Sequence, residues 1–213
     1  MESIPGPGAW AYSKVVARSP FILDLYEAVA EEVCSKFTSG RILDIGTGPG
    51  LVPLKIARKS KALEIFAIDI SHAMVEIATK NAGNAGMSEQ THFHYGSAEK
   101  IPFEKGYFDL AITTLSFHHW AKPEDCLKEV SRVLKENCEL WIYEMKHEPT
   151  AENKKELKRK YGPFLSFLVL NFVRAHSSIS FSKIEQVKEC KDIGFAETVV
   201  EDKGMFVKLR LLK

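Results

Sequence analysis

RILDIGTGPG, residues 41–50, is the stretch that decides the fold. Its apolar half ends on an acid, Asp44, and three glycines follow at every second position, Gly46, Gly48 and Gly50. The apolar half predicts a short buried strand. The glycines predict a tight turn with positive φ, a backbone that can approach a ligand, and close packing of the next helix. The stretch therefore indicates a ligand site at the end of a first strand, with a tight turn that binds nothing as the alternative.

The charge of Asp44 decides which ligand such a loop suits. A dinucleotide loop has the spacing G-x-G-x-x-G, but here the third glycine comes one residue early and Leu51 stands in the expected place. A carboxylate at the strand end repels a pyrophosphate and attracts a cation. S-Adenosylmethionine carries an ammonium and a sulfonium, so the loop favours this cofactor over NAD.

Strands and helices alternate on both sides of this stretch. Apolar runs predict strands, and apolar residues at helical spacing predict helices between them. The expected strands cover residues 41–46, 62–69, 91–96, 107–116 and 139–145, and the expected helices cover residues 19–37, 51–60, 71–86 and 123–138. This alternation predicts an α/β fold, with a parallel sheet, helices on both faces and a ligand outside the carboxyl ends of the strands.

The alternation stops after Met145. We expect a charged helix over 147–162, an apolar run over 164–173, a helix over 181–195 and a final hairpin that turns near residues 202–204. The basic stretch at 154–162 is typical of a solvated helix face.

Length and composition bound the class of protein. The 213 residues fit one domain, and the formal net charge of +1 predicts no general attraction to nucleic acid or to an anionic membrane. The four cysteines stand far apart without a C-x-x-C pair, which predicts reduced thiols in the cytoplasm. The amino-terminal residues lack the apolar core of a signal peptide, and the apolar run at 164–173 is too short to span a bilayer.

Five motifs occur in the order and spacing of one known family. They are LDIGTGPG (43–50), AIDISHAM (67–74), GSAEKIPF (96–103), FDLAITTLSFHHW (108–120) and LKEVSRVLKENCELWIYE (127–144). With them the sequence resembles the class I S-adenosylmethionine-dependent methyltransferases, in the small-molecule group called type 11 or UbiE-like. The resemblance covers about residues 40–145. It implies a Rossmann-like, seven-stranded, mostly parallel sheet whose last strand is antiparallel, with helices on both faces.

The same resemblance implies how the chain is organised. It predicts a single methyltransferase domain over 1–213, in which a helical cap (1–37) and a helical insertion (146–181) lie on the substrate side. The implied partner is a small-molecule methyl acceptor, and S-adenosylhomocysteine is the implied product. If the apolar run at 164–173 lines the pocket, the acceptor is apolar or aromatic. The alternatives for this run are core packing or a contact in a homodimer.

The resemblance also implies a set of cofactor contacts. Asp44 would lie near the methionine ammonium. Asp69 ends the second strand, where a carboxylate can accept hydrogen bonds from both ribose hydroxyls, although an acid that only caps the next helix is the alternative. Ser97 stands where the family usually has an acid toward the adenine amino group, so this acceptor is uncharged. The other implied contacts are Ile70, Met74 and Ala98 at adenine, Thr47 in the glycine loop, Thr114 and Leu115 at the methionine part, and Tyr12 at its carboxylate end.

The segment TLSFHHW, residues 114–120, follows the fourth strand, where the transferred methyl group would emerge. His118 occupies the position where related enzymes direct a polar group toward the substrate, so it is the candidate base. We expect His119 to pack or to form a hydrogen bond instead. Tyr143 and Glu144, at the end of the fifth strand, are further candidates. We expect no metal at the histidine pair, because adjacent histidines rarely share one.

Two other classes of protein compete with this interpretation. A NAD-binding oxidoreductase is disfavoured by the glycine spacing and by Asp44. A binding module that keeps the cofactor but has lost turnover is compatible with the same residues. Methylation of RNA or protein is less favoured, because the total charge is balanced and no N-P-P-Y-like motif follows the fourth strand.

Overall fold

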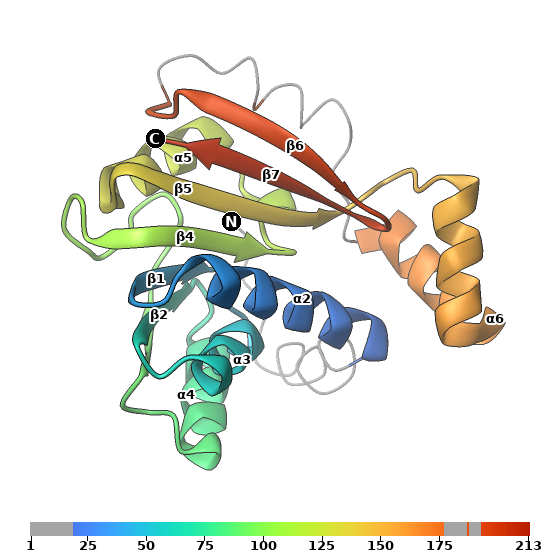
Figure 1. Cartoon of the computed structure of the whole chain (residues 1–213), viewed down its shortest axis with the longest axis horizontal. Helices are drawn as coiled ribbons and strands as arrows, with labels where there is room; N and C mark the ends of the chain where they lie inside the picture. Colours follow the sequence, from blue (N-terminus) through green and yellow to red (C-terminus); the bar gives the residue numbers. More distant parts are fainter. Residues whose placement is uncertain (1–18, 177–186, 188–192) are drawn as a thin grey trace.

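The chain folds around one seven-stranded sheet (Figure 1). The computed structural model describes residues 19–176, residue 187 and residues 193–213. The strands are β1 (Gly40–Ile45), β2 (Leu63–Asp69), β3 (Thr91–Tyr95), β4 (Phe108–Thr114), β5 (Leu134–Met145), β6 (Glu197–Lys203) and β7 (Phe206–Leu212). Their order in the sheet is β3-β2-β1-β4-β5-β7-β6.

The pairing of the strands confirms the predicted fold class. Strands β3, β2, β1, β4 and β5 pair in parallel, and β7 lies antiparallel to both β5 and β6. The last strand is therefore the antiparallel one, as the resemblance implied. Strands β6 and β7 form the predicted hairpin, which turns at Gly204 with φ 73°.

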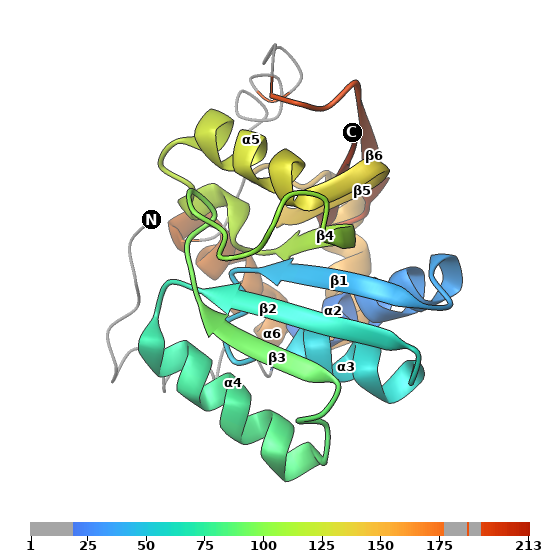
Figure 2. The ribbon, with the colours of Figure 1, turned by 90° about the vertical axis from the view of Figure 1, so that its left-hand side faces the viewer.

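Helices cover both faces of the sheet (Figure 2). They are α2 (Pro20–Lys36), α3 (Leu51–Lys59), α4 (His72–Ala85), α5 (Pro123–Val133) and α6 (Ala151–His176), with one turn of 3-10 helix, η2 (Phe117–His119). Successive strand residues point to opposite faces. Ile42 of β1 accordingly packs with α2 and α3, whereas its neighbour Leu43 packs with α5. Full burial of such a side chain stabilises the fold by about 1.5–3 kcal/mol.

Capping residues in the sequence mark the start and end of α4 and the start of α6. Ser71 caps α4, since its side chain accepts a hydrogen bond from the Met74 amide at 3.4 Å. Gly86, with φ 66°, ends the same helix in the left-handed conformation. Thr150 and Asn153 cap α6 reciprocally, with hydrogen bonds of 3.1 and 3.2 Å. These caps match helix starts expected from the sequence to within a few residues.

One predicted boundary is wrong. The sequence predicted a helix over 123–138, but α5 ends at Val133 and β5 begins at Leu134. Leu134 pairs with Phe108 of β4, and the register then shifts so that Leu110 pairs with Glu139. Asn137 within this shift has φ 60°. Pairing with β4 therefore overrides the helical periodicity of residues 134–138.

Helix α6 contains most of the two segments expected at 147–162 and 164–173. They meet at a kink, because Gly162 is not helical, with φ 77° and ψ 167°, and Pro163 follows it. It packs through Leu157 and Val169 onto the cluster that contains Phe21 and Phe206. Most of the helix predicted over 181–195 lies outside the described residues. Within residues 19–176 and 193–213, no helix has the length and apolar content that a bilayer span requires.

Candidate functional site

The predicted site residues gather at the carboxyl edge of the sheet, around β1 and β4. These two strands lie side by side, and the chain order reverses between them, because β2 follows β1 on one side and β4 lies on the other. Open α/β sheets bind ligands at such a reversal point. We call the residues at the ends of β1, β2 and β4 the strand-end site: Asp44, Thr47, Asp69, Thr113 and Thr114.

The glycine loop after β1 is held by the neighbouring chain segments. The amides of Gly46 and Thr47 donate to the carbonyl of Ile68 at 2.9 and 3.1 Å. Gly46 has φ 73°, and a Cβ atom there would collide with the hydroxyl oxygen of Ser116. A Cβ atom on Gly50 would lie 2.8 Å from the ring of Phe93. Both glycines are thus required by close packing, as expected for Gly50, while the approach of a ligand to Gly48 stays a prediction.

Asp44 is a buried carboxyl group at the end of β1. Its exposed fraction is 1%, and among the described residues its Oδ1 atom has no hydrogen-bond partner. Burial raises the pKa of Asp44 to about 7, and the nearby charge of Asp69 acts in the same direction. A cation bound beside this group would therefore be attracted to it and would favour its ionised form.

Three threonine hydroxyls of the strand-end site are buried. That of Thr47 lies close enough to the Asp44 carboxyl group to act against the rise of its pKa, while the Oγ1 atoms of Thr113 and Thr114 form no hydrogen bond within the described part of the chain. Buried polar groups are almost always hydrogen-bonded in folded proteins. Thr113 and Thr114 are adjacent in β4 and therefore point to opposite faces of the sheet, with Thr114 on the face of Asp44. Asp44 and Thr114 together fit a ligand that carries charged and hydrogen-bonding groups, which the amino-acid end of S-adenosylmethionine does.

Asp69 is already bound to the backbone at both oxygens. Its Oδ2 accepts from the Gly48 amide and its Oδ1 from the Ser71 amide, each at 2.8 Å. The carboxylate therefore joins the glycine loop to the start of α4, which is the alternative that we weighed for it. Each oxygen retains a second lone pair, so the same group can still accept from ribose hydroxyls.

The residues expected at adenine lie beside Asp69. Ile70 is half-buried, while Met74 is buried. The side chain of Ala98 packs in the cluster on the α5 face, which leaves its backbone for the predicted contact. The Oγ of Ser97 accepts a hydrogen bond from the Glu99 amide at 3.2 Å. This hydroxyl is thus partly engaged in its own turn.

The exit from β4 is strained and firmly anchored. Leu115 has φ 56°, which is rare for a side chain of this kind, and its amide donates to the Tyr143 carbonyl at 2.9 Å. Phe117 and Trp120 are buried, with ring centroids 4.9 Å apart. Strained backbone of this type clusters at functional sites. The anchors hold the two residues between them, His118 and His119, at the carboxyl edge.

His118 is bound to Glu144 at two points. The His118 amide donates to Oε1 of Glu144 at 3.2 Å, and its ring atom Nδ1 lies 2.9 Å from Oε2. The side chain of Glu144 is fully buried and that of His118 is 10% exposed. Glu144 was only a secondary candidate from the sequence. The available signal was its position at the end of β5, directly beside the strand that leads to His118.

Two further candidates are placed differently from our expectations. His119 is exposed, with its ring centroid 4.0 Å from that of His118, so it does not pack into the core, and the alternative of a hydrogen bond stays a prediction. A short 3-10 turn between two buried anchors directs it outward.

Tyr143 points to the opposite face of β5 from Glu144, where its hydroxyl donates to Glu32 of α2 at 2.9 Å. Tyr143 therefore does not belong to the strand-end site. Tyr12 lies outside the described residues.

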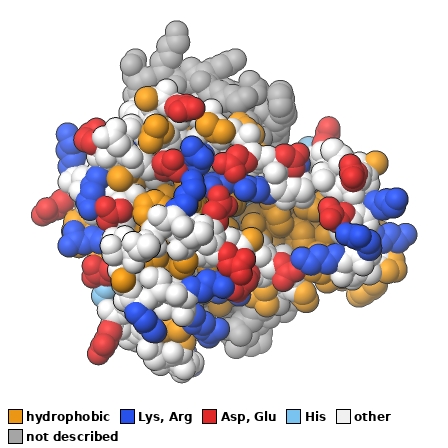
Figure 3. Space-filling view, viewed as in Figure 1, with side chains coloured by type: hydrophobic (Ala, Val, Ile, Leu, Met, Phe, Trp, Pro, Cys, Tyr) orange, Lys and Arg blue, Asp and Glu red, His pale blue; other side chains and the backbone are white. Residues whose placement is uncertain are grey.

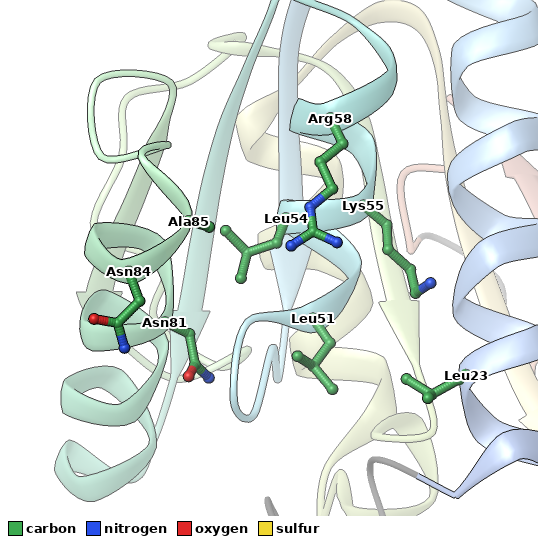
Figure 4. Close-up of a pocket in the computed structure, with 8 residues that line it drawn as sticks. All are labelled: Leu23, Leu51, Leu54, Lys55, Arg58, Asn81, Asn84 and Ala85. Atoms are coloured by element: carbon green, nitrogen blue, oxygen red, sulfur yellow. The ribbon is translucent and has the colours of Figure 1, made fainter.

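A separate pocket of about 670 Å³ lies on the outer side of α3 (Figure 4). Side chains from α2, α3 and α4 line it: Leu23, Leu51, Leu54, Lys55, Arg58, Asn81, Asn84 and Ala85. None of the predicted cofactor or catalytic residues is among them. Lys55 on its rim forms an ion pair with Glu27. The pocket is therefore distinct from the strand-end site.

In the part of the chain that the structure describes, no cluster of three or more acidic, histidine or cysteine side chains could hold a metal ion.

Comparison with known proteins agrees with this geometry. Residues 43–142 match the family model described as "Methyltransferase domain". The methyltransferase YcgJ of Bacillus subtilis is 35% identical over 97 residues, which cover 46% of this chain and 37% of that protein. The demethylmenaquinone methyltransferase of Thermotoga maritima is 32% identical over 133 residues, which cover 62% and 52% of the two chains. The chain thus matches only 37% and 52% of the lengths of these two curated relatives.

Solved structures share the fold. A structure from Methanococcus maripaludis, described as an S-adenosyl-L-methionine-dependent methyltransferase, superposes with a TM-score of 0.77 at 24% identity and covers 100% of this chain and 95% of its own. A phosphoethanolamine N-methyltransferase of Haemonchus contortus, solved with S-adenosylhomocysteine, superposes with a TM-score of 0.70 at 17% identity over 98% of this chain and 57% of its own. The resemblance seen in the five motifs is therefore confirmed over residues 43–142, the part of the chain that matches the methyltransferase-domain family model.

Proposed function

We propose that this protein transfers a methyl group from S-adenosylmethionine to a small-molecule acceptor. The observation that carries the proposal is the buried carboxyl group of Asp44, which has no hydrogen-bond partner at Oδ1 among the described residues and lies at the reversal point of the sheet. Bound S-adenosylmethionine supplies an activated methyl group and leaves as S-adenosylhomocysteine. The protein then has to bind the cofactor and the acceptor, orient them toward each other, and exclude water from the site.

Each residue of the site has a proposed role in binding. Asp44 attracts the methionine ammonium, and Asp69 accepts from the ribose through its remaining lone pairs. Thr114 and Leu115 at the β4 exit contact the methionine part, and Thr47 with the glycine loop lies beneath it. Ile70, Met74, Ser97 and the backbone of Ala98 surround adenine, and Tyr12 closes over the carboxylate end.

The nature of the acceptor is suggested by helix α6. Figure 1 shows α6 beyond the carboxyl ends of β4 and β5, and Figure 3 shows hydrophobic side chains gathered on this part of the surface. Phe164, Phe167 and Leu168 are 75%, 65% and 46% exposed there. We propose that the insertion 146–181 and the cap 1–37 form the acceptor side and that the acceptor is apolar or aromatic. Relatives named for demethylmenaquinone and for ubiquinone and menaquinone support an acceptor of this kind.

Calorimetry tests the cofactor half of this proposal. We expect the protein to bind S-adenosylmethionine and S-adenosylhomocysteine at one site and not to bind NAD. At a ligand concentration a hundredfold above Kd, binding to the folded state alone should raise the free energy of unfolding by about 2.7 kcal/mol. Binding of NAD without S-adenosylmethionine would overturn the proposal in favour of an oxidoreductase.

Turnover is tested separately from binding. Methyl-labelled S-adenosylmethionine is incubated with the protein and a panel of apolar and aromatic small molecules, and label in the organic phase is counted. Transfer to a panel member supports the proposed function. Tight cofactor binding with no transfer to any member would favour a binding module without turnover.

A further inference from the structure

Glu144 holds the ring of His118 in one orientation. One carboxylate oxygen accepts from the His118 amide at 3.2 Å, and the other lies 2.9 Å from Nδ1 of the same residue. Because both oxygens bind one residue, the ring cannot turn without losing a contact to a fully buried charge-bearing group. Full burial of an ionised carboxylate costs desolvation free energy unless its charge and hydrogen-bond partners compensate for it. The pair is therefore a fixed feature of the β4–β5 edge.

The partner at Nδ1 determines which ring nitrogen can accept a proton. An ionised carboxylate only accepts hydrogen bonds, so the contact assigns the proton of the neutral ring to Nδ1. The lone pair of the ring is then on Nε2, the nitrogen on the far side from Glu144. A histidine oriented in this way by a carboxylate is arranged as a general base.

We propose that Glu144 is a positioning residue for His118, and that the pair selects acceptors that must lose a proton as they are methylated, namely hydroxyl groups or acidic carbon atoms. The proposal rests on the proposed function, because it concerns the acceptor of the same methyl transfer. It extends that function by naming the acceptor's reactive group.

Proton balance gives the reason for this choice. An acceptor hydroxyl transfers its proton to Nε2 of His118 while its oxygen forms a bond to the methyl carbon, and the electron pair of the broken carbon–sulfur bond stays on sulfur. His118 becomes an imidazolium, whose charge is balanced by Glu144, and later releases the proton to water. A neutral amine attacks with its own lone pair, and a thiolate carries no proton, so neither needs a base beforehand.

The first experiment determines which ring nitrogen of His118 carries the proton, and it needs no methyl acceptor. Long-range ¹⁵N–¹H NMR of the imidazole of His118 should show a proton on Nδ1 in the wild-type protein. In Glu144→Gln the amide oxygen is retained by the His118 backbone N–H, so the NH₂ group faces the ring. Nδ1 must then accept, and the proton should move to Nε2. A wild-type ring protonated mainly at Nε2 when neutral would overturn the proposal.

A matched variant controls for loss of a carboxylate from the same strand. Glu139 also lies on β5, where it accepts from Nε1 of Trp141 and pairs with Arg210, away from His118. Glu139→Gln should leave the ring proton of His118 on Nδ1. A similar change in both variants would show a general disturbance of β5 and would count against a specific role of Glu144.

The second experiment tests the acceptor class with matched probes. Phenols, the corresponding anilines and the corresponding thiophenols are compared for methyl uptake, with S-adenosylmethionine affinity measured in parallel. We expect uptake by the phenols, a turnover lower by about 10²–10⁴-fold in Glu144→Gln and His118→Ala, and unchanged cofactor affinity in both. Uptake confined to anilines or thiophenols, or full phenol turnover in Glu144→Gln, would overturn the inference.

The two proposals fail in different ways. Absence of S-adenosylmethionine binding in the wild-type protein would refute the proposed function, whereas the NMR result on His118 does not depend on the cofactor. Cofactor binding with the wrong ring proton or the wrong acceptor class would refute only the role assigned to the His118–Glu144 pair.

Discussion

Two buried polar regions of the sheet differ in how completely their groups are partnered. On the face covered by α2, Glu32 accepts from Tyr143 and forms an ion pair with Lys208, whose Nζ also lies 3.6 Å from the ring centroid of Trp141. We call these four residues the α2 network. In the strand-end site, Oδ1 of Asp44 and the hydroxyl of Thr114 have no hydrogen-bond partner among the described residues.

The carboxyl groups of the two regions show what this difference means physically. Burial acts to raise the pKa of Glu32, but Lys208, Tyr143 and Lys203 together outweigh it and the pKa is lowered. Burial also acts on Asp44, where no cation is present in the described structure, and its pKa rises to about 7. The α2 network is therefore complete within the described residues, whereas among the same residues no positive charge compensates Asp44, and a bound cation could supply one.

The largest effect on stability is expected in the α2 network. Glu32→Ala leaves Lys208, which is fully buried, without its carboxylate. Breaking a buried pair from one side typically costs about 3–5 kcal/mol, and because the Glu32 side chain is 25% exposed we expect the lower end of this range. Urea unfolding should show a loss of this size, while calorimetry should show unchanged S-adenosylmethionine affinity. A loss of cofactor affinity equal to that of a site variant would mean that the two regions are not independent.

Asp69→Ala should affect both properties at once. It removes the acceptor of two backbone hydrogen bonds of 2.8 Å, from Gly48 and Ser71, as well as the proposed ribose contacts. We expect cofactor binding to weaken by about 1–3 kcal/mol, with a smaller loss of stability. Calorimetry and urea unfolding measure the two effects. Wild-type affinity in this variant would remove Asp69 from the ribose site.

Asp44→Asn should separate stability from binding. Without a buried acid, the cofactor-free protein should become more stable, with Tm higher by about 2–4 °C for each kcal/mol gained. Binding of S-adenosylmethionine should weaken by about 5–150-fold, because the attraction to the ammonium is lost. If the variant loses stability and keeps full affinity, the contrast drawn between the two regions is wrong.

The pH dependence of this effect has a definite sign. An unfolded Asp titrates at about 3.9, below the folded value of about 7 for Asp44. The folded state therefore retains the proton longer, and the contribution of Asp44 to stability is lost as pH rises through this window. Asp44→Asn should remove that slope in urea unfolding at pH 5 and 7.5. Asp109→Asn is the matched control. Arg41 and Lys135 outweigh burial and lower the pKa of Asp109, so its contribution to stability is lost as pH falls.

Ser97→Asp should give the smallest effect. It restores the charged acceptor usual in the family at the proposed adenine edge, and we expect cofactor affinity to increase by a few-fold in calorimetry. The hydroxyl already accepts from the Glu99 amide, which limits the gain. Unchanged or weaker affinity would indicate that Ser97 does not face the adenine amino group.

Much of the fold and part of the site could be predicted from local patterns. The glycine loop, the acids that end β1 and β2, and the hairpin at Gly204 are each encoded within about ten residues. The end of α5 could not be predicted, because pairing of Leu134 with Phe108 is a contact between distant segments. The same limit applies to Glu144, whose role depends on a neighbour 26 residues away, and to His119, whose direction depends on the buried anchors beside it.

The register shift at the start of β5 has a consequence for how this gene could change over time. Beyond Glu139, adjacent residues of β5 serve opposite faces, so Tyr143 completes the α2 network and Glu144 holds His118. Gaining or losing one codon after the shift would exchange these two side chains and disable both regions together. Length changes are best absorbed within residues 135–138, where the strand already departs from regular pairing. In homologous chains we expect insertions and deletions in β5 to be confined to residues 135–138, while the spacing from Glu139 to Glu144 stays fixed.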